Sequence, residues 1–527
     1  MENKNNIINS YTSDFKKIID MKYKYIDKTE IIYNLIIQRG FFFLNRPRRF
    51  GKSLLISIIK CIFEGRKELF KNLFIYNKLS NWDKYPIITF DFSSRVVENQ
   101  IGFEKMLHSS INKAEIINEL ENNISEENYI DRFDKFLLNA YNKYKKSVVI
   151  LIDEYDYFLL NNLNNELMFN QIQNSMKNFF TYLKSNQEFI SFLFITGITN
   201  ISLNNFFSGV NNIYDISSKS SFFYICGFTE EEIKENFKDE INDILVKFDI
   251  NYENCLSKIK KYYDGYKFNG NQKIGIYNPI DILGLFDIKS FDFFWFNNGK
   301  SSFLAEFIKK NKIVISNLIN SNLYEYEISD INFNNINPIA ILYQTGYLTI
   351  DLYDSKNKTY KMKFSNFEIE SNFFEYLKNY FFNNLKINTI YDISNFKKYL
   401  ENGDIENFCK TLKIFFDDSN YQIIGDAEIY FHNSCYIFCK LLGYQTDVEI
   451  NTKNGRIDMV VNTSCYIYII EFKYDKNAKI ALRQIINKKY HEKYSKFKEK
   501  KIYFVGINFD GNSKGINDYI YQLYKNN

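Results

Sequence analysis

Short runs of apolar residues recur along the first half of the chain, separated by amphipathic stretches. The runs cover residues 85–93, 145–156 and 189–200. Continuous apolar character is typical of strands buried on both faces, and intervening helices favour parallel crossover connections. We therefore predict a parallel sheet with helices on its faces. Residues 31–44 are expected to add a strand, and residues 54–65 a buried helix.

The pattern changes after about residue 225. Thr229 is followed three positions later by Glu232, a capping-box signature for the start of a helix. From there to about residue 400 we expect mostly helices with a few strands, one of them at 346–353. A last region then combines one helix, three strands, a long basic helix and a fourth strand: 427–442, 446–450, 456–462, 465–473, 478–498 and 501–507.

The chain of 527 residues is longer than one hydrophobic core supports, so several domains are expected. We place them at 1–225, 226–400 and 401–527. The overall class is α/β and multi-domain, with a parallel sheet first, a mostly helical middle region and a smaller α/β domain last.

Charge and cysteine content indicate the cellular location of the protein more than its function. With 67 basic and 63 acidic side chains, the net charge of +4 is too balanced to indicate nucleic-acid binding alone. The seven cysteines form no CxxC pair, which favours free thiols in a reducing compartment. Residues 1–17 contain no apolar signal region, and no apolar run approaches the ~20 residues that span a bilayer. We predict a cytoplasmic protein without a membrane partner.

Gly51, Lys52 and Ser53 form the GKS that ends a phosphate-binding loop, but Arg46 stands where such a loop begins with glycine. Backbone N–H groups at a helix start hold phosphates, a lysine reaches the terminal phosphates, and a serine hydroxyl binds magnesium. The first glycine mainly permits a tight turn. Arg46 therefore affects the opening shape of the loop and not its anion-binding end.

A nucleotide site also needs a carboxylate at the end of a neighbouring strand. The run VVILIDEYD supplies Asp153 to bind magnesium water and Glu154 to act as general base toward the attacking water. A chance GKS and an ordinary exposed DE loop are the alternatives. The joint occurrence of the two motifs, in the right chain order, favours a nucleotide site.

A second group of chemical side chains lies near the C-terminus. Strand alternation places Glu471 and Lys473 on one face and Phe472 on the other, while Asp458 lies on the preceding strand. Two carboxylates on adjacent strands can share a hard cation, and a neighbouring lysine can hold the nucleophile or the phosphate. The alternative is an ordinary half-exposed strand face, on which Glu and Lys often alternate.

Basic side chains crowd the segment that follows these strands: Lys476, Lys479, Arg483, Lys488, Lys489, Lys493, Lys496 and Lys498. Such a stripe can neutralise backbone phosphates, or it can be a solvated face, and both interpretations stay open. His432, Cys435 and Cys439 share one helical face. No CxxC pair supplies further ligands, so packing inside a helix is favoured over a zinc site.

The motifs RPRRFGKSL and LIDEYD resemble those of AAA-ATPase-like proteins that are typically joined to a C-terminal nuclease-like domain. The resemblance continues through further segments at 196–217, 226–233, 262–268, 277–283 and 343–350, and it covers most of the chain. RPRRFGKS is the usual loop of this family. The pattern Asp458…Glu471-x-Lys473 with IIEFK resembles the PD-(D/E)XK nuclease fold.

The resemblance implies a P-loop NTPase sheet and a C-terminal PD-(D/E)XK-type domain. The implied nucleotide-binding residues are Arg48, Arg49, Phe50, Gly51, Lys52, Ser53, Leu54 and Asp153. Ser53 and Asp153 would hold Mg²⁺, although Arg48 and Arg49 could equally be solvated. Thr196 and Asn200 lie where a γ-phosphate sensor is expected.

In the C-terminal domain, Asp458, Glu471 and Lys473 would be catalytic. Glu428 would join Asp458 and Glu471 as a ligand of Mg²⁺ or Mn²⁺, and Gln484 and Tyr490 fit the helix that follows.

These expectations describe an ATP-binding and ATP-hydrolysing protein whose nuclease-like domain acts on nucleic acid, in the first instance DNA. Assembly into a homo-oligomer stays open. One alternative is an ATP-dependent nucleic-acid or protein-binding switch with an inactive nuclease fold. Another is a signalling ATPase without a nucleic-acid partner, which the basic stretch disfavours.

Overall fold

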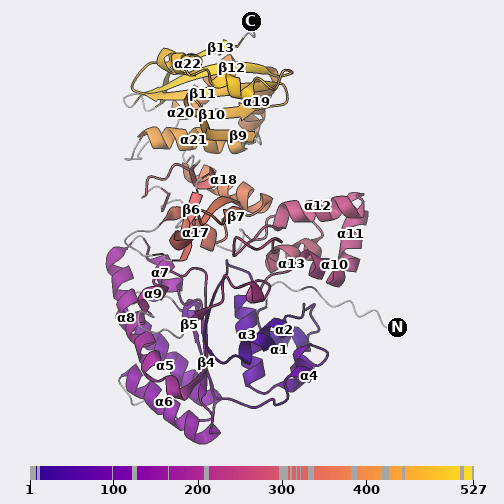
Figure 1. The fold of residues 1–527 in the computed structure, drawn as a ribbon, viewed down its shortest axis with the longest axis vertical. Coiled ribbons are helices and arrows are strands. Elements are labelled where there is room, and N and C mark those ends of the chain that lie inside the picture. The colour runs from indigo at the N-terminus through magenta and orange to yellow at the C-terminus, as the bar shows by residue number, and fades with distance from the viewer. Residues whose placement is uncertain are drawn as a thin grey trace. The chain divides into compact units, whose positions relative to one another are not determined.

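The computed structural model describes most of the chain, and the statements that follow concern these residues (Figure 1). They are residues 8, 12–95, 97, 99–121, 128–163, 165–206, 213–295, 307–308, 311–315, 317–320, 322–329, 331, 337–381, 389–417, 427–441, 445–510 and 515–524. The chain forms two compact units, one of residues 1–303 and 322–369 and one of residues 304–321 and 370–527. The three-domain division from the sequence remains a prediction.

The first unit is built on a parallel five-stranded sheet in the order β2-β3-β4-β1-β5. Its strands are β1 (Gly40–Asn45), β2 (Ile87–Asp91), β3 (Val148–Asp153), β4 (Ile190–Gly197) and β5 (Ile213–Asp215). Every residue of β3 is buried, which explains its unbroken apolar sequence. The predicted parallel sheet is therefore confirmed, with strands in all three of the predicted apolar runs.

Helices cover both faces of this sheet (Figure 1). One face carries α1 (Phe15–Asp20), α2 (Thr29–Ile36), α3 (Lys52–Phe63) and α4 (Ile75–Lys78), and the other carries α5 (Gln100–Ile117), α6 (Tyr129–Tyr144) and α8 (Glu166–Ser185). The strand expected over 31–44 is wrong in its first half, because these residues continue α2 to Ile36 before β1 begins. Helical spacing buries Ile32, Leu35 and Ile36 on one side of α2, a pattern that a short apolar run does not distinguish from a strand.

The abundant asparagines of this chain have a structural use at helix starts. An asparagine side chain accepts a hydrogen bond from an N–H of the first turn at seven described helices, namely at Asn99, Asn128, Asn165, Asn251, Asn278, Asn337 and Asn477. Asparagine is among the best N-cap residues because its oxygen satisfies a donor that the helix leaves unpaired.

Beyond residue 225 the first unit continues as a helical layer with a small antiparallel sheet in the order β6-β8-β7. Its elements are α10 (Glu230–Asn236), α11 (Lys238–Phe248), α12 (Tyr252–Tyr263), α13 (Pro279–Ile288), α17 (Pro338–Gln344), β6 (Asn322–Tyr324), β7 (Leu348–Asp354) and β8 (Thr359–Phe364). Thr229 and Glu232 form the predicted capping box at the start of α10. The strand expected at 346–353 is β7.

The second unit contains a five-stranded mixed sheet in the order β13-β12-β11-β10-β9. The strands are β9 (Gln445–Thr452), β10 (Gly455–Asn462), β11 (Tyr466–Tyr474), β12 (Lys501–Asp510) and β13 (Gly515–Leu523). Only β11 and β12 pair in parallel, and α22 (Ala478–Asn487) connects them. The predicted strands are confirmed, and β13 is an additional strand that was not predicted.

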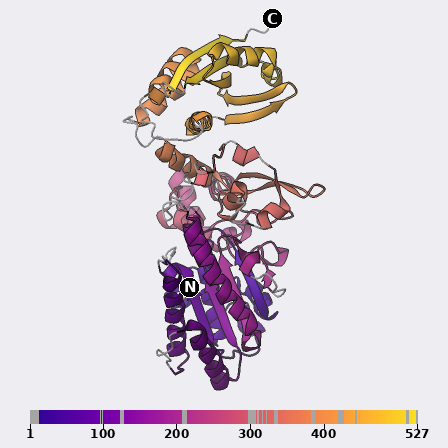
Figure 2. The same ribbon diagram turned by 90° about the vertical axis from the view of Figure 1, so that its left-hand side faces the viewer.

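Helices also cover both faces of the second sheet, as the turned view shows (Figure 2). On one face Ile467 and Ile469 of β11 pack into a core with Leu482 and Ile485 of α22. On the other face the Tyr468 hydroxyl donates to the Leu400 carbonyl of α19 (Thr389–Asn402). The next two helices are α20 (Ile405–Asp417) and α21 (Ala427–Leu441).

The long basic helix expected over 478–498 is wrong in its length. α22 ends at Asn487, and Lys489 adopts a left-handed backbone with φ 50° before a short 3₁₀ turn, η7 (Tyr490–Tyr494). This turn buries Tyr490 and Tyr494 against the sheet, which a continuing straight helix would not do. The burial of Tyr490 and Tyr494 therefore overrides the helical propensity of the lysines at 488–498.

Two carboxylic acids are buried together in the first unit. Asp281 of α13 and Glu368 at the start of α18 (Phe367–Phe381) have no exposed surface, and their side chains interact. Burial, and then the neighbouring Glu368 carboxyl, raise the pKa of Asp281 far above its usual range. The native pair therefore holds a proton that the unfolded chain releases.

This proton predicts a pH-dependent stability. Its contribution to the free energy of unfolding is complete below about pH 4 and is lost as pH rises toward the native pKa, by at most about 1.4 kcal/mol per pH unit. We expect Asp281→Asn to remove this dependence, because an amide can donate to Glu368 without a proton to lose. Thermal unfolding midpoints of the parent, of Asp281→Asn and of the exposed control Asp287→Asn on the same helix, measured from pH 5 to 8, test this. Parallel curves for the parent and Asp281→Asn would show that a proton held by Asp281 and Glu368 does not cause the pH dependence.

Candidate nucleotide and metal sites

The loop between β1 and α3 forms one wall of a cavity of about 550 Å³. All residues from Arg48 to Leu55 line it, as do Glu154 and Tyr157 beyond β3. Gly51 has φ 90° and precedes the first residue of α3, so the loop turns sharply into the helix. The volume lies within the range of about 300–1,000 Å³ that is typical of small-molecule sites.

Lys52 is buried although it carries a charge, with 4% of its surface exposed. Its ammonium donates hydrogen bonds to the carbonyls of Arg46 and Pro47, both at 3.0 Å. The lysine therefore bridges the opening and the end of the loop. Ser53, in the first turn of α3, lines the same cavity and is half-buried.

Arg46 takes no part in the cavity wall. Its guanidinium is buried and donates to the carbonyls of Ser217 at 2.8 Å and Phe222 at 3.2 Å, and it lies 3.8 Å from the centre of the Phe268 ring. The arginine that replaces the first glycine of the motif thus ties the loop to the segment after β5.

The carboxylates at the end of β3 lie where strand order brings them close to the loop. Because β4 lies between β3 and β1, the end of β4 borders both. There the Thr196 hydroxyl donates to the Asp153 carboxylate at 2.5 Å. Asp153 is buried, whereas Glu154 lines the cavity.

Glu154 combines an unusual backbone with a perturbed charge. Its φ of 50° is rare for a non-glycine residue and turns the chain sharply at the end of β3. Burial raises the pKa of Glu154, and the positive charge of Lys52 partly offsets this. A carboxylate that faces a cavity with a raised pKa is suited to accept a proton.

Asn200 is not among the described residues that line this cavity. Its backbone N–H donates to the Gln344 side chain at 2.9 Å, and its side-chain oxygen accepts from the same amide at 2.8 Å. Of the two residues expected to sense a γ-phosphate, only Thr196 is next to a predicted magnesium ligand.

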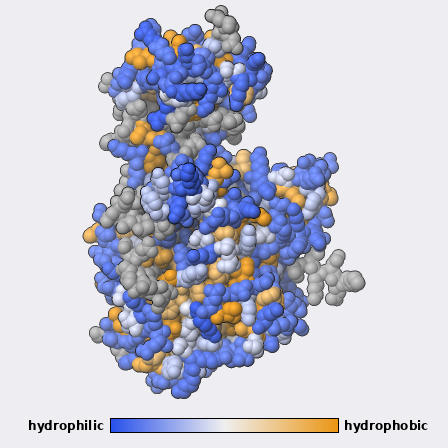
Figure 3. Space-filling view, viewed as in Figure 1, coloured by the Kyte–Doolittle hydropathy of each residue, from blue (hydrophilic) through white to orange (hydrophobic). Residues whose placement is uncertain are grey.

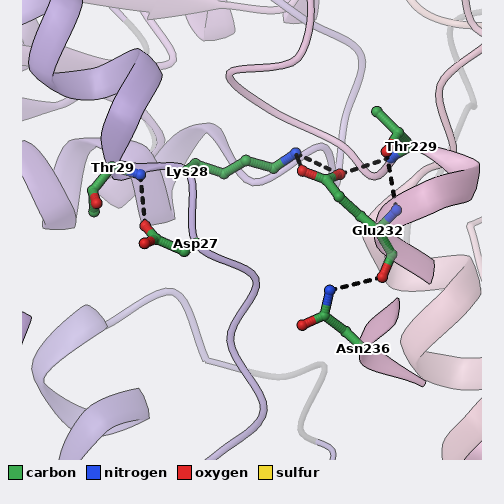
Figure 4. A network of polar contacts seen from close by, with 6 residues as sticks. All are labelled: Asp27, Lys28, Thr29, Thr229, Glu232 and Asn236. Carbon is green, nitrogen blue, oxygen red and sulfur yellow. Dashed lines mark hydrogen bonds and ion pairs between the residues drawn. The ribbon is translucent and has the colours of Figure 1, made fainter. Parts of the chain in front are cut away.

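Further lining residues come from three segments that sequence reasoning did not connect with the cavity, within 24–28, 225–228 and 279–283. Figure 4 shows how the first of these is held, with the Lys28 side chain extended toward α10. Its ammonium contacts both oxygens of Glu232, at 2.6 and 2.7 Å, and Glu232 also completes the capping box with Thr229. Burial lowers the pKa of Lys28, and Glu232 opposes that effect. The capping box was visible in the sequence, but its buried partner was not.

In the second unit, Asp458 of β10 and Glu471 of β11 lie together as the strand pattern predicted. The Asp458 carboxylate accepts a hydrogen bond from the Phe472 N–H at 2.8 Å. Glu471 has 1% of its surface exposed. Burial, and then the charge of Asp458, raise the pKa of Glu471 to about 8, although Lys473 acts in the opposite direction.

Lys473 and Gln484 contact the same carboxylate. The Lys473 ammonium lies 3.2 Å from the Glu471 Oε1 atom, and the Gln484 amide donates to that atom as well. Gln484 also contacts the Tyr490 hydroxyl, which donates to the Arg456 carbonyl at 2.7 Å. The predicted catalytic group and the two supporting residues from the following segment are therefore adjacent.

The residues of this second site fit a divalent cation. The Glu471 Oε2 atom is buried and has no hydrogen-bond partner among the described residues, so an oxygen ligand is available beside a second carboxylate. The described residues contain no group of three or more His, Cys, Asp or Glu side chains arranged for a metal. Glu428 lies in the first turn of α21, and its side chain is outside the described part.

The cysteines of α21 are buried, and burial raises the pKa of Cys435 and of Cys439. Thiols of this kind pack as small apolar groups. His432 lies 6.1 Å from the Phe472 ring, and burial lowers its pKa to about 4. All seven cysteines are free, as predicted.

The basic side chains after β11 are all exposed: Lys476, Lys479, Arg483, Lys488, Lys489, Lys493, Lys496 and Lys498. The turn between β9 and β10 lies beside them, because the Asn454 amide donates to the Lys488 carbonyl at 3.2 Å. This turn adds the exposed Lys453, and the exposed Arg456 follows at the start of β10. The face of the second unit seen in Figure 3 is mainly hydrophilic. In the described part of the chain, no helix is both long and apolar enough to cross a membrane.

Two family models match the chain. One, described as "Predicted AAA-ATPase" and named AAA-ATPase-like, matches residues 11–207. The other, the PD-(D/E)XK nuclease superfamily, matches residues 426–519. The first match includes the cavity loop and the end of β3, and the second includes Asp458, Glu471 and Lys473.

A relative resembles the chain over nearly its whole length. It is an uncharacterised protein in the vnfD 5′ region of Azotobacter chroococcum mcd 1, 28% identical over 514 residues, which cover 94% of each chain. No solved structure matches.

Proposed function

Because residues 11–207 form an AAA-ATPase-like domain and residues 426–519 a PD-(D/E)XK nuclease superfamily domain, we propose that this chain couples ATP hydrolysis to metal-dependent cleavage of nucleic acid. ATP and Mg²⁺ would bind at the cavity beside Lys52. The phosphodiester would be cleaved at Asp458, Glu471 and Lys473, with Mg²⁺ or Mn²⁺.

One observation supports the proposal most strongly. In each unit, the structure brings together side chains from different elements that the sequence had singled out. Lys52 and Glu154 share a cavity, and Lys473 and Gln484 contact one buried carboxylate. Ordinary exposed strand faces and loops would not bury these charges together.

At the nucleotide site, the Lys52 ammonium would exchange its two carbonyl partners for phosphate oxygens. Such an exchange replaces neutral acceptors with charged ones, which form stronger hydrogen bonds. Glu154 would accept the proton of the attacking water, as its cavity position and raised pKa favour. Ser53 and Asp153 would hold Mg²⁺, which supplies positive charge to the phosphates.

At the second site, Asp458 and Glu471 would hold the cation, which polarises the scissile phosphate. Lys473 would orient the nucleophile and offset the charge that develops on phosphate oxygens. Gln484 would hold the Glu471 carboxylate in place from the following helix. The exposed lysines after β11 would neutralise the nucleic-acid backbone, and the free cysteines agree with a cytoplasmic location.

Incubation of the purified full chain with labelled single- and double-stranded DNA and RNA tests the proposal. Each substrate is combined with and without ATP, and with Mg²⁺, Mn²⁺ or a chelator. We expect metal-dependent cleavage that ATP alters. Binding without cleavage under any of these conditions would favour the alternative of a switch with an inactive nuclease fold.

The Glu154→Gln variant separates binding from hydrolysis at the first site. The amide can still orient a water molecule but cannot accept its proton, so ATP binding should persist while turnover falls about 100-fold or more. Calorimetric titration with ATP and phosphate release under saturating ATP measure the two effects. Turnover at the parent rate would remove Glu154 from the role of general base.

A further inference from the structure

The phosphate loop, residues 46–53, is also contacted by side chains from the region beyond residue 225. The Arg48 carbonyl accepts two side-chain hydrogen bonds, from the Asn278 amide and from the Trp295 indole, each at 3.2 Å. Both donors are distant from the loop in sequence. A single carbonyl with two such donors is fixed in orientation, and with it the whole peptide plane.

Two apolar contacts flank this carbonyl. Pro47 lies so close to Gly346 that a Cβ atom there would come within 2.7 Å of the proline ring. On the other side, Phe50 packs edge-to-face on Tyr266 with ring centres 4.9 Å apart. The segments 262–268, 277–283 and 343–350, for which the sequence suggested no role, therefore each supply a residue that contacts the loop.

Trp295 makes a second contact that leads away from the loop. Its backbone N–H donates to the Glu368 carboxylate at 2.7 Å. The centre of its ring lies 5.2 Å from the centre of the Tyr347 ring. Glu368 is the second residue of α18, where the Asn366 side chain accepts from the Ile369 N–H. The chain passes from the first unit into the second within this helix, after residue 369.

We propose that Trp295 is a positioning residue for the phosphate loop and couples nucleotide binding there to the first turn of α18. The inference rests on the proposed ATP site. In a planar trans peptide, the N–H of Arg49 is directed opposite to the Arg48 carbonyl, away from the two donors. Phosphate binding at this loop polarises its peptide units, which strengthens hydrogen bonds to their carbonyls. Phosphate binding therefore strengthens the hydrogen bond from the Trp295 indole to the Arg48 carbonyl. Through Trp295 it also strengthens the hydrogen bond to Glu368. The effect is reciprocal, since a firmly held α18 also favours phosphate binding.

Trp295→Phe in the full chain tests the inference, because phenylalanine keeps the ring beside Tyr347 and loses only the indole donor. We expect the KM for ATP to rise about 3- to 10-fold, the effect of one hydrogen bond, with kcat within about twofold of the parent. Hydrogen exchange followed by mass spectrometry should show ATP-induced protection of amides at the start of α18 in the parent, and loss of this protection in Trp295→Phe.

The chain offers a matched control in its other tryptophan. Trp82 packs on Phe70 at 5.0 Å, and its indole N–H has no hydrogen-bond partner among the described residues. Trp82→Phe should behave like the parent, and it leaves Trp295 as the one tryptophan of the chain. ATP should then change the fluorescence of Trp82→Phe, but not that of Trp295→Phe.

Asn278→Asp is a second variant for the case in which Trp295→Phe does not fold. Aspartate keeps the N-cap acceptor for the Ile280 N–H and loses the donor to Arg48, so ATP affinity should fall. Absence of ATP binding by the parent would refute the proposed function itself. If the parent binds ATP, parent-like affinity and protection in Trp295→Phe, or in Asn278→Asp when the first variant is unfolded, would overturn the positioning role. Weaker affinity with unchanged protection of α18 would overturn the coupling.

Discussion

Lys52→Ala is expected to weaken ATP binding by about 100-fold or more, because charged hydrogen bonds to phosphate contribute far more than neutral ones. The loss has two origins. The variant lacks the cation that would contact phosphates, and it lacks the hydrogen bonds that tie the end of the loop to the carbonyls of Arg46 and Pro47. Calorimetric titration with ATP measures the effect.

Lys60→Ala is the control for this change. Lys60 lies on the same helix, and its ion pair with Glu64 at 3.8 Å is partly exposed, so its removal should leave ATP affinity within about twofold. Circular dichroism of both variants checks that the fold is kept. A folded Lys52→Ala chain with parent affinity for ATP would show that the loop is not a nucleotide site.

Glu471→Gln is expected to reduce metal-dependent cleavage by at least about 100-fold, because it removes a charged oxygen ligand from a cation that needs several. Asp458→Ala should have the same effect. ATP hydrolysis should continue in both variants, because these carboxylates and the nucleotide cavity belong to different units.

Lys473→Ala distinguishes the roles within this site. It should bind the cation and still lose most cleavage, since the lysine would act on the nucleophile and the phosphate. Isothermal titration with Mn²⁺ and cleavage of labelled DNA separate the two effects. Glu499→Gln and Lys501→Ala, both exposed in the same unit, are the matched controls. Cleavage at the parent rate by Glu471→Gln would show that Glu471 and Lys473 belong to an ordinary strand face and not to a catalytic site.

Most strands of the two five-stranded sheets were predictable because their apolar periodicity is local, whereas β5 and β13 were not predicted. A residue such as Ile150 on a fully buried strand needs only its neighbours in sequence to indicate that strand. The capping box at Thr229 is local in the same way. Where local signals conflict, the prediction failed: α2 extends to Ile36 in a run interpreted as a strand, and the turn after Asn487 ends a helix that lysine propensity would continue.

In the candidate sites, too, local features were predictable from the sequence and long-range contacts were not. Alternation along one strand was enough to place Glu471 and Lys473 on one face, since successive side chains point to opposite sides. The burial of Arg46 behind the loop, and the meeting of Trp295 with the Arg48 carbonyl across 247 positions, had no sequence signal of their own. Spacing along the chain is read directly from the sequence. Which distant segments meet, and which charges become buried when they do, depends on long-range packing of whole elements that no local pattern encodes.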